Sequence, residues 1–361
     1  MRDELAERLL AAVMHWEEEQ VVEVGGQLQA LARHKYDRYG SFRPGERFLE
    51  SLAQWLQEFK NYKDREHALE FVLEKLIFIK GAELNHLIEM VYPDILRPRL
   101  ISRVSTELGC PSYQVARITC SLAFRALQRR MLIIGLSDGS RLDLLRRACP
   151  ELSHEQFWLS PDQGDDAQLR MKRKLDEALN QFGLAETPRT FGEIVLAEDF
   201  SGSGITLLRR ADQSNWDGKL ANAHDWIEKL KERQYVDAKA RVLLIVYIAS
   251  SQAAISLQKL LSETSWGWEL KPIQLLPESA VVTDRYIRSL CEEFFDEALV
   301  DSHKGKAPLG YNECALPVVL EHNTPNNSVS LLWADTSNDP RSTLHRHALF
   351  PRYERHHRDR P

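Results

Sequence analysis

Residues 194–206 read Ile-Val-Leu-Ala-Glu-Asp-Phe-Ser-Gly-Ser-Gly-Ile-Thr, and this stretch decides the fold. Its first four residues form an apolar run of the length expected for a strand buried on both faces. Two carboxylates and a turn of small residues follow, and residues 207–210 are then expected to begin a helix. A strand, a turn and a helix in this order predict a unit of a parallel α/β sheet.

The turn has the chemistry of an anion site. Gly202 and Gly204 permit backbone angles that other residues avoid, so that successive amide groups can converge on one anion. Ser201, Ser203 and Thr206 add hydroxyl donors. The positive end of a following helix would also favour a phosphate.

The acidic pair has a different expected role. Glu198 and Asp199 would repel a phosphate, so they are expected to accept hydrogen bonds from sugar hydroxyls one ribose length away. A phosphate and a ribose diol together describe a 5-phosphoribosyl group. The stretch resembles the phosphoribosyltransferase family. The loop of that family that binds 5-phosphoribosyl 1-diphosphate (PRPP) has an apolar strand, two acidic residues and a small Thr/Ser/Gly turn. Two positions depart from that pattern: Glu198 replaces the commoner Asp, and Ile205 stands where a hydroxyl residue is usual.

Three other interpretations compete for these residues. The first is a structural turn with incidental acids. The second is a SAM-dependent methyltransferase, because residues 199–204 also resemble the Phe-x-Gly-x-Gly cofactor loop of DNA-type methyltransferases; the Asn/Asp-Pro-Pro-aromatic element of those enzymes is missing. The third is a dinucleotide fold, in which the last glycine of the motif would fall at Leu207.

A second strand with a polar loop precedes this one. Residues 131–136 are apolar and lead into hydroxyls, a glycine and one guanidinium, which suit a multiply charged oxygen acceptor. By position the loop resembles the segment that contacts pyrophosphate in phosphoribosyltransferases; an ordinary capped turn is the alternative. The loop consists of Ser137, Asp138, Gly139, Ser140 and Arg141.

A third strong strand is expected at residues 241–249, before a helix that begins near Ser250. Strands that alternate with helices predict a mostly parallel α/β sheet, here of the phosphoribosyltransferase type. Right-handed crossovers would place the loops at Ser137, Ser201 and Ser250 along one edge. Residues 214–237 are expected to form a polar and helical segment that serves as a mobile cover over that edge.

The C-terminal part narrows the resemblance. A last strand is expected at residues 314–320, before the polar loop 321–328. This loop, Gly310-Tyr311 and the Leu-Phe-Pro-Arg element at 349–352 together resemble motifs of phosphoribosyltransferase-like proteins of bacterial conflict systems. Some of those proteins are encoded with retrons or other antiphage modules. The resemblance covers roughly residues 130–352. It makes His322, Asn323 and Asn326 candidates for recognition of an acceptor base.

Leucine and aromatic stripes predict that residues 1–128 form an all-helical accessory domain. The α/β domain is expected at residues 129–344, and residues 345–361 form a tail rich in Arg and His. Residues 104–117 have the spacing of a helix-turn-helix, for which a plain helical hairpin is the alternative. A helix-turn-helix would make this segment a candidate contact for duplex DNA. The basic tail is a candidate contact for RNA, DNA or a protein partner, and a disordered end is the alternative.

Composition limits the remaining choices. A net charge of -6 gives no support to general attraction for nucleic acid, and five scattered cysteines indicate neither a zinc site nor a disulfide framework. No apolar run approaches the length of a membrane span, and a cytoplasmic protein is expected. Within these limits, the resemblance implies an effector that binds PRPP, with Mg2+, or a phosphoribosyl nucleotide. It is expected to react at the ribose anomeric carbon or to serve as a non-catalytic sensor.

Overall fold

The structure is a computed structural model that describes residues 3–159, 164–184, 186–213, 215–300 and 306–352. The chain forms two compact units. One combines Met1–Glu83 with Pro277–Pro361, and the other is Leu84–Leu276. The predicted C-terminal tail beyond residue 352 lies outside the described residues.

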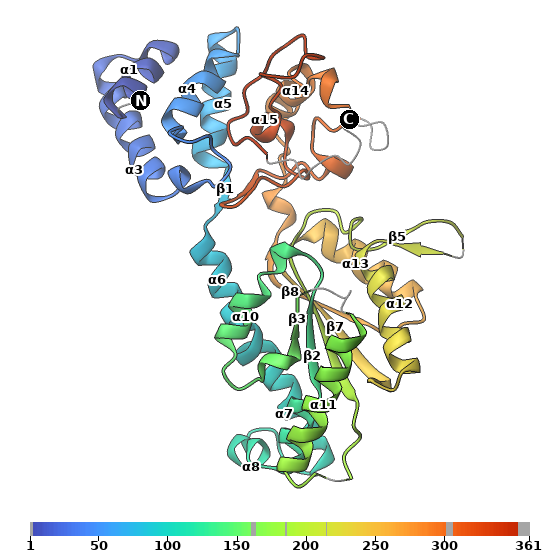
Figure 1. Cartoon of the computed structure of the whole chain (residues 1–361). Coiled ribbons are helices and arrows are strands. Elements are labelled where there is room, and N and C mark those ends of the chain that lie inside the picture. The colour runs from blue at the N-terminus through green and yellow to red at the C-terminus, as the bar shows by residue number, and fades with distance from the viewer. Residues whose placement is uncertain (1–2, 160–163, 185, 214, 301–305, 353–361) are drawn as a thin grey trace. The chain divides into compact units, whose positions relative to one another are not determined.

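The second unit is built around a five-stranded sheet in which every neighbouring pair of strands is parallel (Figure 1). Its spatial order, β3-β2-β4-β7-β8, is the doubly wound order 2-1-3-4-5 when the strands are counted along the chain. The predicted α/β fold with a parallel sheet is confirmed. The strands are β2 (Met131–Gly135), β3 (Phe157–Trp158), β4 (Phe191–Ser201), β7 (Val236–Ser250) and β8 (Glu269–Leu276).

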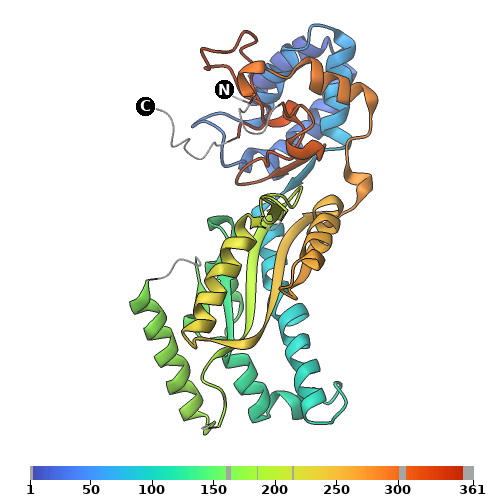
Figure 2. The same cartoon turned by 90° about the vertical axis from the view of Figure 1, so that its right-hand side faces the viewer.

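Helices cover both faces of this sheet, as the apolar strands require. Helices α11 (Asp165–Gln181), α12 (Lys219–Glu232) and α13 (Ser251–Glu263) share one apolar core with Leu196 of β4. Alternation along β4 turns Glu193 to the other face, where it pairs with Arg99 and Arg103 of α7 (Arg97–Glu107). In Figure 2 the helices run along the strands of this unit. Its other helices are α6 (Gly81–Met90), which starts in the first unit, α8 (Val115–Thr119), α9 (Leu122–Arg129) and α10 (Leu142–Ala148).

The first unit joins the beginning and the end of the chain. Strand β1 (Ile77–Ile79) pairs in parallel with β9 (Val318–Leu320), and one core contains aromatic side chains from both segments. The last predicted strand therefore pairs with β1 and not with the five-stranded sheet. The helices of this unit are α1 (Asp3–Met14), α2 (Glu18–Gln20), α3 (Gly26–His34), α4 (Phe48–Gln57), α5 (Tyr62–Glu74), α14 (Arg285–Glu293) and α15 (Ser330–Trp333).

The compact units divide the chain at other positions than the predicted domain boundaries at 128 and 344. The reason is the core of the first unit: Phe350 at the C-terminal end contacts the rings of Tyr36, Phe48 and Phe78. Local sequence patterns do not reveal such a long-range pairing. The N-terminal segment is helical as predicted, apart from turns, loops and β1.

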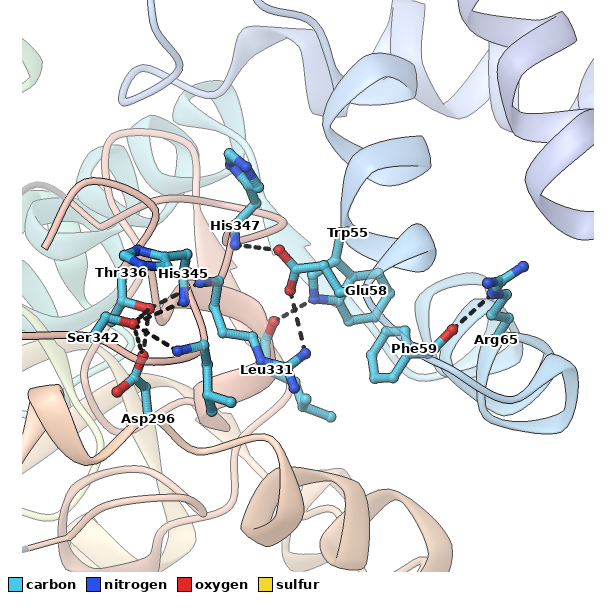
Figure 3. A network of polar contacts seen from close by, with 12 residues as sticks. Trp55, Glu58, Phe59, Arg65, Asp296, Leu331, Thr336, Ser342, His345 and His347 are labelled. Carbon is cyan, nitrogen blue, oxygen red and sulfur yellow. Dashed lines mark hydrogen bonds and ion pairs between the residues drawn. The ribbon is translucent and has the colours of Figure 1, made fainter.

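Buried polar contacts fix the segment before Phe350 (Figure 3). Asp296 accepts hydrogen bonds from the side chains of Thr336 and Ser342, and Ser342 accepts one from the backbone of His345. Arg346 pairs with Glu58 of the first helical segment, at 3.3 Å. These contacts give the C-terminal segment a structural role in the first unit.

Candidate functional site

The site lies where strands β2 and β4 end side by side. The chain leaves β2 toward β3 on one side and later leaves β4 toward β7 on the other, so the two strands flank the switch point of the sheet. Pairing between them stops at Gly135 and Ala197, while β4 continues beside β7 as far as Ser201. The loop after β2 and residues 198–201 of β4 therefore lie next to each other.

Glu198 is the centre of the site and is only 3% exposed. Its Oε1 accepts a hydrogen bond from the Ser137 hydroxyl at 2.7 Å, and Lys219 Nζ lies 2.8 Å from Oε1 and 2.9 Å from Oε2. Burial raises the pKa of this carboxyl to about 7. Lys219 lowers that pKa, Asp199 raises it and the Ser137 hydroxyl lowers it. Burial has the largest effect, because moving a charged carboxylate out of water costs more free energy than one ion pair provides.

Asp199 faces the loop after β2. Successive strand residues point to opposite faces, so Glu198 reaches α12 while Asp199 lies against Gly139. A side chain at Gly139 would bring its β-carbon within 2.3 Å of Asp199 Oδ2. The two predicted acids thus lie at one strand end, but their carboxylates meet different neighbours.

Hydrogen bonds and close packing hold the loop Ser137–Arg141 in position. The buried Tyr247 on β7 donates a hydrogen bond to the Ser140 carbonyl oxygen at 2.7 Å. Gly135 leaves room for the Ser140 hydroxyl, which would lie 2.4 Å from an added β-carbon. Arg141 has a φ of 45°, in the left-handed region, and donates to Asn85 of α6 at 3.4 Å. Asp138, at the tip of the loop, is exposed.

The glycine turn after β4 is held by α13. Gly204 has a φ of 80°, and a side chain there would meet Leu257 at 2.9 Å. Ser250, which caps α13, donates a hydrogen bond to the Gly202 carbonyl oxygen. Ser201 and Ser203 are buried and Thr206 is exposed. The turn is therefore a defined backbone structure at the same edge of the sheet as Glu198.

The helix predicted at 207–210 is wrong. Leu207 and Leu208 are buried in a turn, and a short hairpin follows, formed by β5 (Arg209–Arg210) and β6 (Trp216–Asp217). The next helix, α12, begins only at Lys219, and its first two amides already donate to the carbonyl oxygens of Thr206 and Leu207. The first amides of a following helix were expected to favour a bound phosphate. In the structure, those of α12 donate to carbonyl oxygens of the turn instead.

The helix predicted within residues 214–237 is present as α12, but it packs into the core and does not form a mobile cover. Its buried residues Leu220, Ile227 and Leu230 belong to the same core as the sheet. Because that face is apolar at helical spacing, α12 is the crossover between β4 and β7. It brings Lys219 to the site.

The model of the family PRTase-CE matches residues 52–352 of the chain. The chain belongs to this family. PRTase-CE is phosphoribosyltransferase-like, which agrees with the expected resemblance and with the doubly wound sheet. The match starts within α4 and so includes most of the predicted helical segment. No curated protein and no solved structure matches the chain.

Three predicted residues of this PRTase-CE protein belong to the first unit, whereas Glu198 belongs to the second. His322 and Asn323 are half-buried, and Asn323 Oδ1 accepts a hydrogen bond from the backbone of Thr324. The Asn326 carbonyl oxygen accepts one from Tyr311, in the Gly310-Tyr311 segment. Their assignment to an acceptor base stays a prediction.

Two further residues at the PRTase-CE site are not evident from local sequence patterns. Lys219 follows Gly218 in an unremarkable polar stretch, and Tyr247 lies inside an apolar strand. A buried glutamate next to a second acid needs a cation nearby to offset its charge, and this need is the signal that could have indicated a lysine.

None of the described helices is long and apolar enough to cross a membrane.

Proposed function

We propose that the protein binds PRPP or a phosphoribosyl nucleotide at the switch point between β2 and β4. The observation that carries the proposal is the junction of the Ser137–Arg141 loop with the acidic pair, through Ser137 to Glu198 and Gly139 to Asp199. Glu198 and Asp199 take the ribose hydroxyls. The turn residues Ser201, Gly202, Ser203 and Gly204, with Thr206, take the 5'-phosphate, and the Ser137–Arg141 loop takes the pyrophosphate.

The proposed reaction takes place at the ribose anomeric carbon. The bond from this carbon to pyrophosphate breaks through an oxocarbenium-like transition state, pyrophosphate leaves with the electron pair, and a nucleophile forms the new bond. An acceptor base as the nucleophile gives transfer. Water gives hydrolysis and loses a proton to the solvent. The products are ribose 5-phosphate and pyrophosphate from PRPP, or ribose 5-phosphate and the free base from a phosphoribosyl nucleotide.

Mg2+ enters the proposal together with PRPP. This ion keeps several waters and binds largely through substrate phosphates. The Glu198 carboxylate is held by Ser137 and Lys219, which fits an ion carried by the diphosphate better than one held by this side chain. When bound, Mg2+ would neutralise charge that develops on the leaving pyrophosphate.

Pyrophosphate release tests the enzymatic proposal. The full chain is incubated with PRPP and Mg2+, with and without bases or nucleotides, and pyrophosphate is measured. We expect turnover that falls at least 100-fold in Asp199→Asn, with Asp225→Asn, an exposed change on α12, as the control. Turnover that is unchanged in Asp199→Asn would contradict the catalytic assignment of this residue.

A binding module without turnover is the second candidate. It is favoured by the engagement of Glu198 with Lys219 and by Ile205 at the position of a usual hydroxyl. This candidate predicts that calorimetry detects binding of PRPP while no pyrophosphate is released. Toxicity on expression that survives Asp199→Asn would also support it.

The wider proposal is an effector of a bacterial antiphage system that acts in the cytoplasm with a nucleic-acid or protein partner. The combination of the glycine turn with the Gly310-Tyr311 and Leu349–Arg352 elements supports it by resemblance. All five cysteines lack a disulfide, which fits a reducing compartment. A plaque assay with the natural neighbouring genes tests it: protection that is equal with and without this gene would contradict the defence role.

A further inference from the structure

Lys219 supplies the positive charge at the acidic pair, and nothing in the motif assigns it a role. We propose that Lys219 is a phosphate-binding residue of the site, which Glu198 holds until a phosphorylated ligand releases it. The inference deepens the proposed function and rests on it.

The backbone places Lys219 at the end of the glycine turn. Its amide donates to the Thr206 carbonyl oxygen at 3.2 Å, and the next amide, of Leu220, donates to Leu207 at 2.9 Å. Gly218 makes this approach possible, because it has a φ of 110° and any β-carbon there would lie 2.6 Å from the Leu207 carbonyl oxygen. The start of α12 is thus bound to the end of the turn, while the Lys219 side chain reaches Glu198.

The charges around the turn explain the need for this lysine. Residues 201–206 contain no cationic side chain, and two carboxylates precede them directly. The next two arginines along the chain are already paired: Arg209 with Asp217 and Arg210 with Glu263. A phosphate that enters the turn would therefore be repelled by the acidic pair unless the ammonium group of Lys219 offsets the charge.

Exposure makes an exchange of partners possible. The Lys219 side chain is 31% exposed, whereas that of Glu198 is 4% exposed, so an anion from solvent can reach the ammonium group before it reaches the carboxylate. A lysine has a flexible stem and rotatable donors, and can turn to a new partner with little change of the backbone. Its departure would leave Glu198 Oε2 open to accept a ribose hydroxyl, while Oε1 keeps the hydrogen bond from Ser137. Phosphate binding and ribose binding are then coupled.

Inorganic phosphate is a suitable probe because it carries the charge of the 5'-phosphate and has neither the ribose nor the diphosphate that the other loops take. Its affinity is measured by calorimetry at pH 8 for the full chain and for Glu198→Gln, Lys219→Met and the double variant. Glu198→Gln removes the partner that holds Lys219, so we expect binding about 10-fold tighter than in the natural protein. The double variant should lose this gain, by about 10-fold or more, because the freed ammonium group is missing.

Controls separate binding from folding. Lys229→Met, an exposed change on the same helix, should leave affinity within about 2-fold. Lys219→Met alone leaves a buried carboxylate without its cation and can impair folding, whereas the double variant removes both charges and keeps the comparison valid. Circular dichroism and melting temperature establish that the compared variants are folded.

The outcomes distinguish this inference from the proposed function. Tighter binding in Glu198→Gln that disappears in the double variant supports the Lys219 assignment. If the natural protein binds PRPP but Glu198→Gln and the double variant bind inorganic phosphate equally, only the Lys219 assignment is overturned. If the natural protein binds neither PRPP nor ribose 5-phosphate, the proposed function itself is overturned.

Discussion

The α-carbon of Gly139 lies against the carboxylate of Asp199, and this contact joins the two loops that the strand ends β2 and β4 present. An added β-carbon would lie 2.3 Å from Oδ2, 2.7 Å from Cγ and 3.0 Å from Oδ1. Space for Asp199 therefore depends on the absence of a side chain at Gly139. Position 139 is thus part of the candidate site through its shape.

Gly139→Ala should displace the Asp199 carboxylate and weaken PRPP binding by about 10-fold or more, because overpacking costs about 1–3 kcal/mol. Calorimetry measures the affinity, and thermal unfolding shows how much of the change is lost stability. Gly164→Ala is the matched control, since its added methyl group meets no atom within 4 Å. Equal affinities of the two variants would contradict a role for this contact.

The pH dependence of stability should reveal the buried Glu198. Its pKa is raised by burial to about 7, above the value of about 4.3 for an exposed glutamate. The folded protein then binds the proton more tightly than the unfolded chain. Tighter binding of the proton adds about 3–4 kcal/mol to the free energy of unfolding. This stabilisation is fully present below about pH 4 and is lost as the pH rises through 7.

Denaturant unfolding of the natural protein and of Glu198→Gln at pH 5 and pH 8 measures this loss. We expect the natural protein to lose stability relative to Glu198→Gln between these pH values, because glutamine does not ionise. The groups that face Glu198 are Lys219, Asp199 and the Ser137 hydroxyl, and all three remain in the variant. A difference between the two proteins that stays constant with pH would show that Glu198 keeps an ordinary pKa.

Tyr247→Phe should loosen the Ser137–Arg141 loop. The variant removes the donor to the Ser140 carbonyl oxygen and leaves a buried acceptor without that bond, at a cost of about 1–3 kcal/mol. Pyrophosphate affinity and the free energy of unfolding should both fall, and the exposed Tyr113→Phe should change neither. If stability falls and affinity does not, the hydrogen bond holds the sheet but does not shape the site.

The strands were predictable because their signals are local. The apolar runs at 131–136, 194–197 and 241–249 became β2, β4 and β7, and parallel pairing then brought the Ser137 loop to Glu198 and Asp199. Their assignment to a phosphoribosyl ligand stays a prediction. The shared edge follows from strand direction alone, which is why no knowledge of side-chain contacts was needed.

The errors arose where distant contacts decide the structure. Leu207 and Leu208 have helix-forming side chains, but their burial in the core of the second unit overrides that propensity. The strand 318–320 pairs with Ile77–Ile79, near the other end of the chain, and neither segment alone indicates its partner. Lys219 was missed for the same reason, because its meaning depends on a buried carboxylate 21 residues earlier.

Asp296→Ala tests whether the C-terminal segment is a structural part of the first unit. The buried Asp296 accepts hydrogen bonds from Thr336, Ser342 and the backbone of Ala298, and their combined effect lowers its pKa despite the opposing effect of burial. The variant leaves these donors without their acceptor and should destabilise the protein by about 3 kcal/mol or more. Thermal unfolding at neutral pH measures the loss, with the exposed Asp225→Ala as control. Because a lowered pKa stabilises the fold only above the unfolded value of about 3.9, the difference from Asp296→Ala should shrink as the pH falls toward 3. A melting temperature equal to that of the control would mean that Arg346, Glu58 and the Phe350 core hold the segment without Asp296.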